Sequence, residues 1–397
     1  MGKQKQPIYR INLRPYRILT FPLLLPVALL LALFNKLSPI PFKIYPIRVD
    51  RVGQMASSNE EYLCELDHGL HPREFRVFVY RDRPSNGALL ELLKRAMPIH
   101  QIFLPLFDIC HKLGGLGVSS MYVHKVSGND PKGLARFHPG HLSLSEAEKA
   151  EGERQCAELG IAPGTPIVPV MSRDNAYLQK IQEPTALDTY RNVEIDSYIP
   201  AMEMLANTHA VVRMGTAVTG KLPTSHPGII DYSLSGKRTE LLDVYLSAAC
   251  RFFLSCGTGL DSITVCSFRK PVLYVHSIPP ADVPFFKPNT MVALKKYWHT
   301  KEERYLSLSE LFSRKLAKMV NASDLSPHDI VVHDCTPEEV TEAVREMTAR
   351  LDGSWVETDE DKTLQERFRD ILEQGTGIRY QGHMSAYSLR TYPFWAE

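Results

Sequence analysis

The pattern of apolar and polar positions is clearest over residues 239–276, where it predicts a helix, a strand, a tight turn, a second helix and a second strand. Thr239 is placed to cap the first helix, and residues 251–255 (RFFLS) predict a short buried strand. The turn is Cys256-Gly257-Thr258-Gly259, and the second strand is 272–275. Because parallel strands are joined by a crossover helix, this segment predicts one right-handed βαβ unit of an open parallel sheet.

The glycine turn lies where such sheets bind ligands, at the carboxyl end of one strand and the amino end of the next helix. Free N–H groups and the helix dipole attract an anion such as a phosphate at that position. A single Gly-x-Gly is more often only a tight turn. The prediction of a phosphate site at Gly257 and Gly259 therefore depends on what the rest of the chain brings to the same edge.

Alternating strands and helices on both sides of this unit predict two α/β domains, residues 45–160 and 161–397. The first domain is expected to have strands at 48–52, 75–80 and 121–126 and helices at 57–63, 86–97, 102–111 and 143–159. The second is expected to have further strands at 166–171, 210–212, 228–232 and 329–332 and helices at 200–206, 306–320 and 336–353. A last amphipathic helix around 364–372 is long enough to cross back to the first domain.

Residues 1–44 differ from the rest, because several basic residues precede an uncharged apolar run, 18–34. A straight helix of that length reaches roughly 26 Å, which is marginal for a bilayer core. Pro22 and Pro26 would also kink it. The run has no small-residue cleavage site after it, so a cleaved signal peptide is disfavoured. Membrane association through residues 1–44 is therefore expected.

Two membrane arrangements and one soluble arrangement fit residues 1–44. A spanning helix with its amino end in the cytoplasm would place the folded body outside. A kinked segment that lies in the membrane surface, with basic residues on both flanks, would keep the body at the cytoplasmic face of the inner membrane. The surface arrangement is favoured, because free cysteines belong in a reducing compartment. The third arrangement is a buried helix packed on the body.

Composition narrows the functional classes. The 397 residues carry 46 basic and 45 acidic side chains, so charge gives no support for a nucleic-acid partner. The seven cysteines are odd in number and form no CxxC pair, which argues against a disulfide framework and a zinc knuckle. His138 and His141 are three positions apart, but two histidines without a third ligand are a weak metal signal. No bound metal is expected.

Polar side chains recur at the predicted strand ends of the second domain. Arg173 and Asp174 follow one strand, Arg213 ends the next, and Asp231 ends a third. The carboxyl ends of parallel strands meet at one edge of a sheet, so these groups should lie near the Gly257 turn. The planar fork of arginine suits a phosphate or carboxylate, and the recurrence favours an anion site over chance.

Several segments together resemble an uncharacterised bacterial glycosyltransferase family found in surface-polysaccharide gene clusters. They are RVGQMASSNEEYL (51–63), Ser85-Asn86, MSRDNAYL (171–178), VVRMG (211–215), IDYSLSGKR (230–238), DVYLSAACRFFLSCGTG (243–259) and EMTARLDGSW (346–355). The resemblance runs from about Arg51 to the end. One departure is Gln54, where the family pattern often has a histidine; if that histidine is the base, this chain lacks it.

The resemblance implies two Rossmann-like domains of the GT-B type and transfer of a sugar from a nucleotide-sugar donor to a glycan or lipid-linked acceptor, without a metal or other cofactor. The donor is expected in the second domain and the acceptor in the cleft facing the first. The residues assigned to catalysis are Arg213, Asp174 and Glu60, with Glu61, Asp67 and His68 as further candidates for the base. The donor set is Arg173, Gly215, Asp231, Arg238, Ser255, Gly257, Thr258, Gly259 and Asp261, and the acceptor set is Arg51, Gly53, Gln54 and Asn86.

Two rival functions remain open. One is a pyruvyl or phosphosugar transferase on the same fold, because fold does not fix chemistry. The other is a membrane-tethered, non-catalytic scaffold of a polysaccharide assembly complex. A kinase or a dehydrogenase is disfavoured, since the sequence has neither GxxxxGK[ST] nor a strand-borne GxGxxG.

Overall fold

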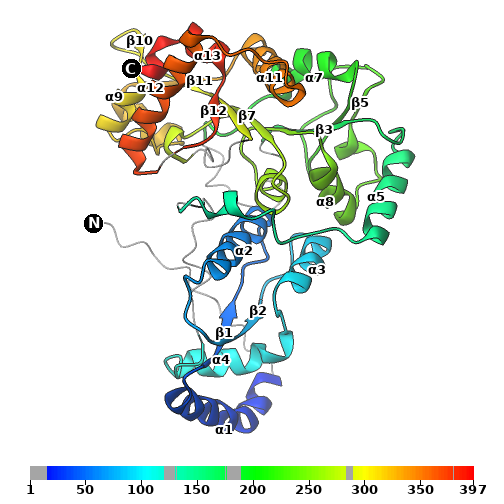
Figure 1. The fold of residues 1–397 in the computed structure, drawn as a ribbon, viewed down its shortest axis with the longest axis vertical. Coiled ribbons are helices and arrows are strands. Elements are labelled where there is room, and N and C mark those ends of the chain that lie inside the picture. Colours follow the sequence, from blue (N-terminus) through cyan, green and yellow to red (C-terminus); the bar gives the residue numbers. More distant parts are fainter. Residues whose placement is uncertain are drawn as a thin grey trace.

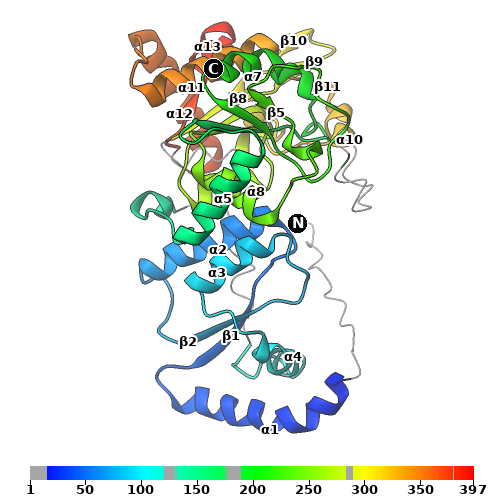
Figure 2. The same ribbon diagram turned by 90° about the vertical axis from the view of Figure 1, so that its right-hand side faces the viewer.

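The computed structural model describes residues 16–119, 130, 132–174, 176, 189–282, 289–378 and 380–397. Figures 1 and 2 show two lobes stacked along the long axis of the molecule, with α2 and α3 of the first lobe against the second. The α/β class expected from the sequence is observed in both lobes.

The second domain is built on a seven-stranded sheet in which all hydrogen-bonded neighbours run parallel, in the order β12-β8-β7-β6-β3-β4-β5. The strands are β3 (Ile167–Met171), β4 (Ala210–Arg213), β5 (Ile229–Ile230), β6 (Phe253–Ser255), β7 (Val272–Ser277), β8 (Thr290–Leu294) and β12 (His383–Met384). The strands predicted at 166–171, 210–212 and 272–275 are confirmed.

Helices cover both faces of this sheet. One apolar cluster joins the sheet to α8 (Glu240–Ala249), α9 (Leu308–Ser313) and α12 (Asp359–Thr376). A second cluster on the other face includes α7 (Ile199–Ala206) and α11 (Pro337–Asp352). Because both faces are covered, β7 is buried along its whole length and its sequence is mostly apolar, as is typical of parallel sheets.

Several helix ends follow from local chemistry. Capping boxes start α9 at Ser307, α11 at Thr336 and α12 at Thr358. The helix predicted over 306–320 is shorter than expected, because Lys315 takes a left-handed φ of 61° soon after α9 ends. A separate antiparallel sheet of β9 (Lys296–His299), β10 (Arg304–Tyr305) and β11 (Ile330–His333) completes the domain.

The first domain has a smaller parallel pair, β1 (Phe42–Pro46) and β2 (Phe75–Val79). Single bridges extend this pair to Ser119 and Ile99. Its helices are α2 (Val52–Asp67), α3 (Gly87–Ala96) and α4 (Leu104–Lys112). The strand predicted at 48–52 is wrong: the strand lies earlier, and Val52 begins α2. The strand predicted at 121–126 lies outside the described residues.

The two domains share apolar contacts. The core of the first domain, built on α2 and α3, also contains Val244 of α8 and Ile263 of the short helix η7 (Ile263–Ser267). Helix α5 (Glu146–Glu158) begins at a capping box formed by Ser145 and Glu148. It packs on α8, where a Cβ on Gly152 would meet the Tyr245 ring. Its Glu148 also forms an ion pair of 2.8 Å with Arg95 of α3 in the first domain.

The C-terminal helix stays within the second domain. Helix α12 packs against α9, β12 and α13 (Ala386–Thr391), and Figures 1 and 2 show it on the side of the second domain away from the first. The expected crossing back to the first domain is therefore wrong. The physical reason is that the apolar face of α12, with Phe368 and Leu372, is used by the core of its own domain.

Helix α1 (Tyr16–Leu37) lies across the end of the first domain that faces away from the second (Figures 1 and 2). Leu24, Ala28 and Leu31 pack on the apolar cluster that contains α4. Leu30 and other large apolar side chains on the remaining faces are exposed. Among the described residues, no helix combines the length and the apolar character needed to cross a membrane.

Candidate active site

The expected rim is formed by the carboxyl ends of adjacent strands. Met171 of β3 lies opposite Ser255 of β6, and Arg173 and Gly257 each follow two positions beyond the end of their strand. On the other side of β3, Arg213 ends β4. The arginines and the glycine turn predicted to share one edge therefore come from three neighbouring strands.

Hydrogen bonds within residues 255–261 hold the glycine turn in place. The Asp261 carboxylate accepts hydrogen bonds from the Ser255 hydroxyl and the Thr258 N–H, each at 2.6 Å. The Gly257 N–H donates to the Ser255 hydroxyl at 3.2 Å. Asp261 is buried, and burial raises the pKa of its carboxyl group to about 6. Asp261 and Ser255, expected to bind the donor, therefore shape the turn, and two of its N–H groups already have partners.

Arg191 is a cation of the site that the sequence analysis missed. Its guanidinium donates to the Gly257 carbonyl at 2.8 Å. Near it, the buried Lys295 at the end of β8 donates to the Asn192 carbonyl at 2.8 Å. Lys295 directly follows a strand, so the rule that site residues lie at strand ends could have identified it. Arg191 belongs to no strand or regular helix, and no sequence pattern marks it.

Arg213 is turned inward rather than toward a cleft. Its buried guanidinium donates to the Gly220 carbonyl at 2.9 Å and to Asp231 at 3.2 Å. Asp174 accepts a hydrogen bond of 2.6 Å from the Thr219 N–H of the same loop. Arg213, Asp174 and Asp231, predicted as catalytic or donor-binding residues, hold this loop in position. Gly215 starts the loop with a φ of 143°, and a side chain there would collide with Val218.

Arg238 lies at the start of α8 and not at the rim. It forms an ion pair with the buried Asp243, which also accepts a hydrogen bond from the Tyr232 hydroxyl at 3.2 Å. Burial raises the pKa of Asp243 to about 6. Its neighbour Thr239 contacts Gln155 of α5. The geometry thus gives Arg238 a packing role on the α5 side of the domain.

The amino end of α2 meets the glycine turn across the domain boundary. A Cβ placed on Gly53 would lie 2.8 Å from the Gly259 Cα, so the two backbones touch. Arg51 is the N-cap residue and makes no side-chain cap hydrogen bond. The first-turn N–H groups of α2 are therefore oriented for an anion at this junction. Gln54, on the same turn, is exposed.

Asn86, expected on the acceptor side, is a domain contact. Its side chain caps α3 by accepting from the Leu89 N–H at 2.8 Å. Its amide group donates to the Glu240 carbonyl of α8 at 3.0 Å. The Gly87 N–H also donates to the Glu240 carboxylate, at 2.8 Å.

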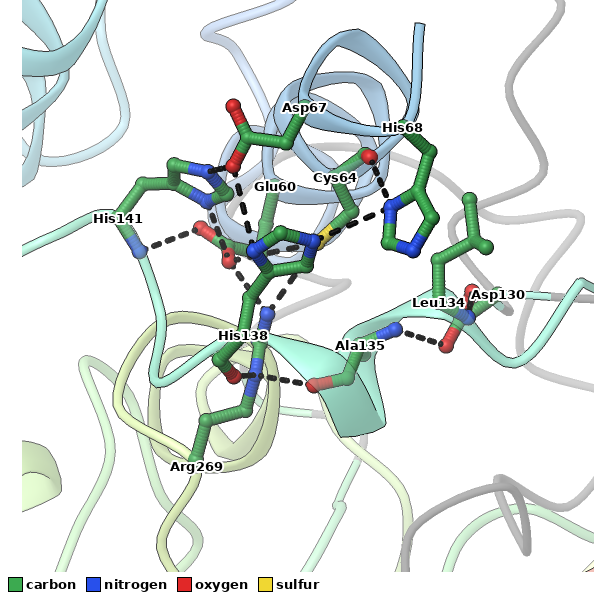
Figure 3. Close-up of polar contacts among 10 residues, drawn as sticks. All are labelled: Glu60, Cys64, Asp67, His68, Asp130, Leu134, Ala135, His138, His141 and Arg269. Carbon is green, nitrogen blue, oxygen red and sulfur yellow. Dashed lines mark hydrogen bonds and ion pairs between the residues drawn. The ribbon is translucent and has the colours of Figure 1, made fainter. Parts of the chain in front are cut away.

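A second polar group lies between the domains and is called here the histidine cluster. It consists of Glu60, Cys64, Asp67, His68, His138, His141 and Arg269, drawn in Figure 3. Glu60 is buried, accepts from His141 Nδ1 at 2.9 Å and pairs with Arg269 at 2.5 Å. The Cys64 sulfur and the Glu60 carboxylate raise the pKa of His141 to about 10. Glu60, predicted as a base, is thus neutralised by two cationic partners. Glu61 is buried on the same helix.

The chain matches no protein-family model and no curated protein sequence. Among solved structures it is similar to a family 9 glycosyltransferase from Veillonella parvula, at 10% identity and a TM-score of 0.47, over 79% of this chain and 98% of that one. It is also similar to ADP-heptose lipopolysaccharide heptosyltransferase II from E. coli, at 14% identity and 0.43, over 78% and 100%. A third is E. coli heptosyltransferase WaaC with ADP-2-deoxy-2-fluoro heptose, at 11% identity and 0.31, over 64% and 93%.

Proposed function

We propose that this protein is a glycosyltransferase of the GT-B type that takes its sugar from a nucleotide-sugar donor. The observation that carries the proposal is the junction of Gly53 and Gly259, where an uncapped helix end of one domain meets the strand-end turn of the other. Arg191 adds a cation beside the same turn, and Arg173 follows the neighbouring strand β3. A diphosphate between two domains fits this combination of N–H groups and positive charge.

The proposed chemistry places charge where these groups can stabilise it. As the glycosidic bond to the diphosphate breaks, negative charge grows on the leaving phosphate oxygen. Fixed N–H groups and arginines aimed at that oxygen lower the barrier by several kcal/mol, about 3 for each well-placed donor. No metal or organic cofactor is needed in this scheme. Arg213 and Asp261 support it indirectly, by holding the loop and the turn that shape the rim.

The acceptor is proposed to be a surface-polysaccharide or lipid-linked glycan, whose hydroxyl group attacks the sugar. That hydroxyl needs a base. Glu60 and Asp174 were the expected candidates, but Arg269 neutralises the first and the Thr219 N–H occupies an oxygen of the second. Either carboxylate would have to leave these partners before it could accept a proton.

The test is donor turnover by the full-length protein. We expect hydrolysis of one sugar nucleotide from a panel with different bases and sugars, and a rise in melting temperature with the matching nucleoside diphosphate. An Arg191→Ala variant should weaken nucleotide binding about tenfold, since a charge-assisted contact contributes roughly 1.5 kcal/mol or more. Stabilisation by phosphoenolpyruvate alone would favour a pyruvyl transferase. Binding of neither class would favour the scaffold and contradict the proposal.

We also propose that α1 attaches the protein to the cytoplasmic face of the inner membrane by lying in the bilayer surface. Its inner face is fixed by Ala28 and by Asn35, whose side chain bonds the Phe42 backbone in both directions. Its other faces expose Leu23, Val27, Leu29, Leu30, Leu33, Phe34 and Leu37. An exposed apolar surface of this kind, with basic residues before and after it in the sequence, suits an anionic lipid surface.

Replacing Leu30 with serine is expected to weaken binding to vesicles of phosphatidylethanolamine and phosphatidylglycerol about tenfold, the loss of roughly 1.4 kcal/mol of apolar burial. Leu30 is 66% exposed, so the fold should be unaffected. Co-sedimentation measures the change. The matched control is Val356→Ser, at an exposed apolar position of the second domain, which should bind as the parent does. Equal binding of both variants would argue against attachment through this face.

A further inference from the structure

Three side chains of the histidine cluster surround one point. The Asp67 carboxylate lies 2.8 Å from His141 Nε2 and 3.2 Å from His138 Nδ1. Asp67 belongs to the last turn of α2, whereas the histidines lie in the segment between η3 (Leu134–Phe137) and α5 (Figure 3). The potential ligand atoms of the three all lie within 4.8 Å of one another.

This spacing suits a tetrahedral transition-metal ion. For ligand distances of 2.0–2.1 Å, the edge between two ligands of a tetrahedral zinc site is roughly 3.3 Å. The two separations measured from Asp67 are close to that edge. Two imidazoles and one carboxylate are also a donor set that Zn²⁺ takes in proteins. We propose that Asp67, His138 and His141 bind one divalent ion of the zinc class, with a fourth position open to water.

A second possible group, Glu60, Cys64 and His141, shares one histidine with this one. The electrostatics decide between them. Arg269 forms an ion pair with Glu60 at 2.5 Å and donates to the Cys64 sulfur at 3.4 Å. A metal ion there would lie beside a guanidinium group that already neutralises the site. Arg269 contacts the Asp67 group at the His138 backbone carbonyl rather than at a potential ligand atom. The Asp67 side chain is 47% exposed, which gives an ion access to the group.

The groups around the ligands also fit. Metal-bound histidines commonly donate their second ring N–H to a carboxylate or another acceptor, which fixes the ring. Here His141 Nδ1 contacts the buried Glu60 at 2.9 Å, which leaves Nε2 directed at Asp67. The second nitrogen of His138, Nε2, lies 3.1 Å from His68 Nδ1, which already donates to the Cys64 carbonyl at 2.9 Å. The His68 ring would therefore have to turn when His138 binds an ion through Nδ1 and carries its proton on Nε2. The His141 ring is oriented before an ion arrives, and the ion would displace its Nε2 proton.

The site would connect the two domains. The His138 carbonyl accepts a hydrogen bond of 3.1 Å from Arg269 of the second domain, and the Arg269 side chain also donates to the Ala135 carbonyl. An ion held by Asp67 and His138 would therefore tie the end of α2 to the segment that Arg269 holds against the second domain. We infer a structural role that favours one arrangement of the domains, separate from the proposed transfer chemistry. The sequence predicted no bound metal, because the two histidines had no recognisable third ligand nearby. In the proposed site Asp67 is that third ligand.

The experiment is a Zn²⁺ titration of the full-length protein after treatment with a chelator, read by competition with a chromophoric chelator and by thermal unfolding. We expect one high-affinity ion per chain and a melting temperature that rises with Zn²⁺. His138→Gln should lower the affinity at least tenfold and remove the rise, whereas the exposed His328→Gln should behave as the parent. Asp67→Asn is the second test, for the case that His138→Gln does not fold in metal-free buffer.

The alternative group of Glu60, Cys64 and His141 predicts the opposite result for a Cys64 variant. Cys64→Ser should leave the Zn²⁺ affinity unchanged if the ion sits on Asp67, His138 and His141. A loss of binding in Cys64→Ser, an unchanged affinity in both His138→Gln and Asp67→Asn, or no stoichiometric binding by the parent would each overturn the proposal. None of these readouts depends on nucleotide turnover, so they are independent of the proposed function.

Discussion

Replacing Gly53 with alanine is expected to lower donor turnover roughly hundredfold, because misplacing reacting groups by about 1 Å costs about that factor. The added Cβ would lie 2.8 Å from the Gly259 Cα and 3.3 Å from the Gly259 carbonyl oxygen. These are backbone atoms of a turn that Asp261 holds rigid, so the turn cannot easily move aside. The helix must instead retreat, and the junction that forms the proposed diphosphate site opens. Steady-state kinetics with the preferred donor measure the effect.

Gly87→Ala is the matched control, because it makes the same change at the start of another helix of the same domain interface. Its Cβ would also be close to a neighbour, at 2.9 Å, but that neighbour is the flexible end of the Glu240 side chain. We expect a turnover loss of no more than a few fold. If Gly53→Ala and Gly87→Ala behaved alike, the Gly53–Gly259 contact would not set the geometry of the proposed site.

The sequence predicted which residues come together better than what each one does. The strand-end rule predicted neighbouring strand ends before Arg173, at Arg213 and before the Gly257 turn, and β3, β4 and β6 are neighbours in the sheet. It could not predict that Arg213 would turn to Asp231 and the loop carbonyls, or that Asp261 would fold back on its own turn. Those partners depend on loop paths that have no periodic pattern.

The histidine cluster also could not be predicted from the sequence, because its members are far apart along the chain. His138 and His141 are visible as a pair, but their carboxylate partner Asp67 lies more than 70 positions earlier, on a helix whose packing no local pattern reports. The segment 42–52 is a local example. Strands were possible at either end of it, and pairing with β2 selects Phe42–Pro46. In each case a tertiary partner decides between locally equivalent choices.

His276 lies at the end of β7, next to the Gly257 turn, and is completely buried with a left-handed φ of 53°. Its Nδ1 accepts a hydrogen bond from the Cys335 N–H at 3.1 Å. Its Nε2 lies 3.0 Å from the Ser197 hydroxyl, which itself donates to the Glu194 carbonyl, so the ring N–H donates to Ser197. A second ring proton would point at the Cys335 N–H. Burial, together with Lys295 and Lys296, lowers the pKa of His276 from 6.5 to about 3.

Acid is therefore expected to destabilise the second domain through this group. Because the folded pKa lies below the unfolded value, the unfolded chain binds the proton more readily at intermediate pH. The contribution of neutral His276 to stability is complete above pH 6.5 and is lost as pH falls toward 3. At pH 4 the loss amounts to about 3 kcal/mol. Urea unfolding from pH 7 to pH 4 measures the free energy of unfolding.

His276→Asn removes the titrating group while keeping an acceptor for the Cys335 N–H, and asparagine tolerates a left-handed φ. We expect the variant to be less stable than the parent at pH 7, because the ring volume and the Ser197 contact are lost. Between pH 7 and pH 4, however, its stability should fall by about 3 kcal/mol less than that of the parent. Asp243 and Asp261, whose raised pKa values act in the opposite direction, are common to both proteins and cancel in the difference. Parallel pH curves for parent and variant would mean that His276 has the same protonation in the folded and unfolded states over this pH range. The neutral, buried form of the ring would then not stabilise this end of β7.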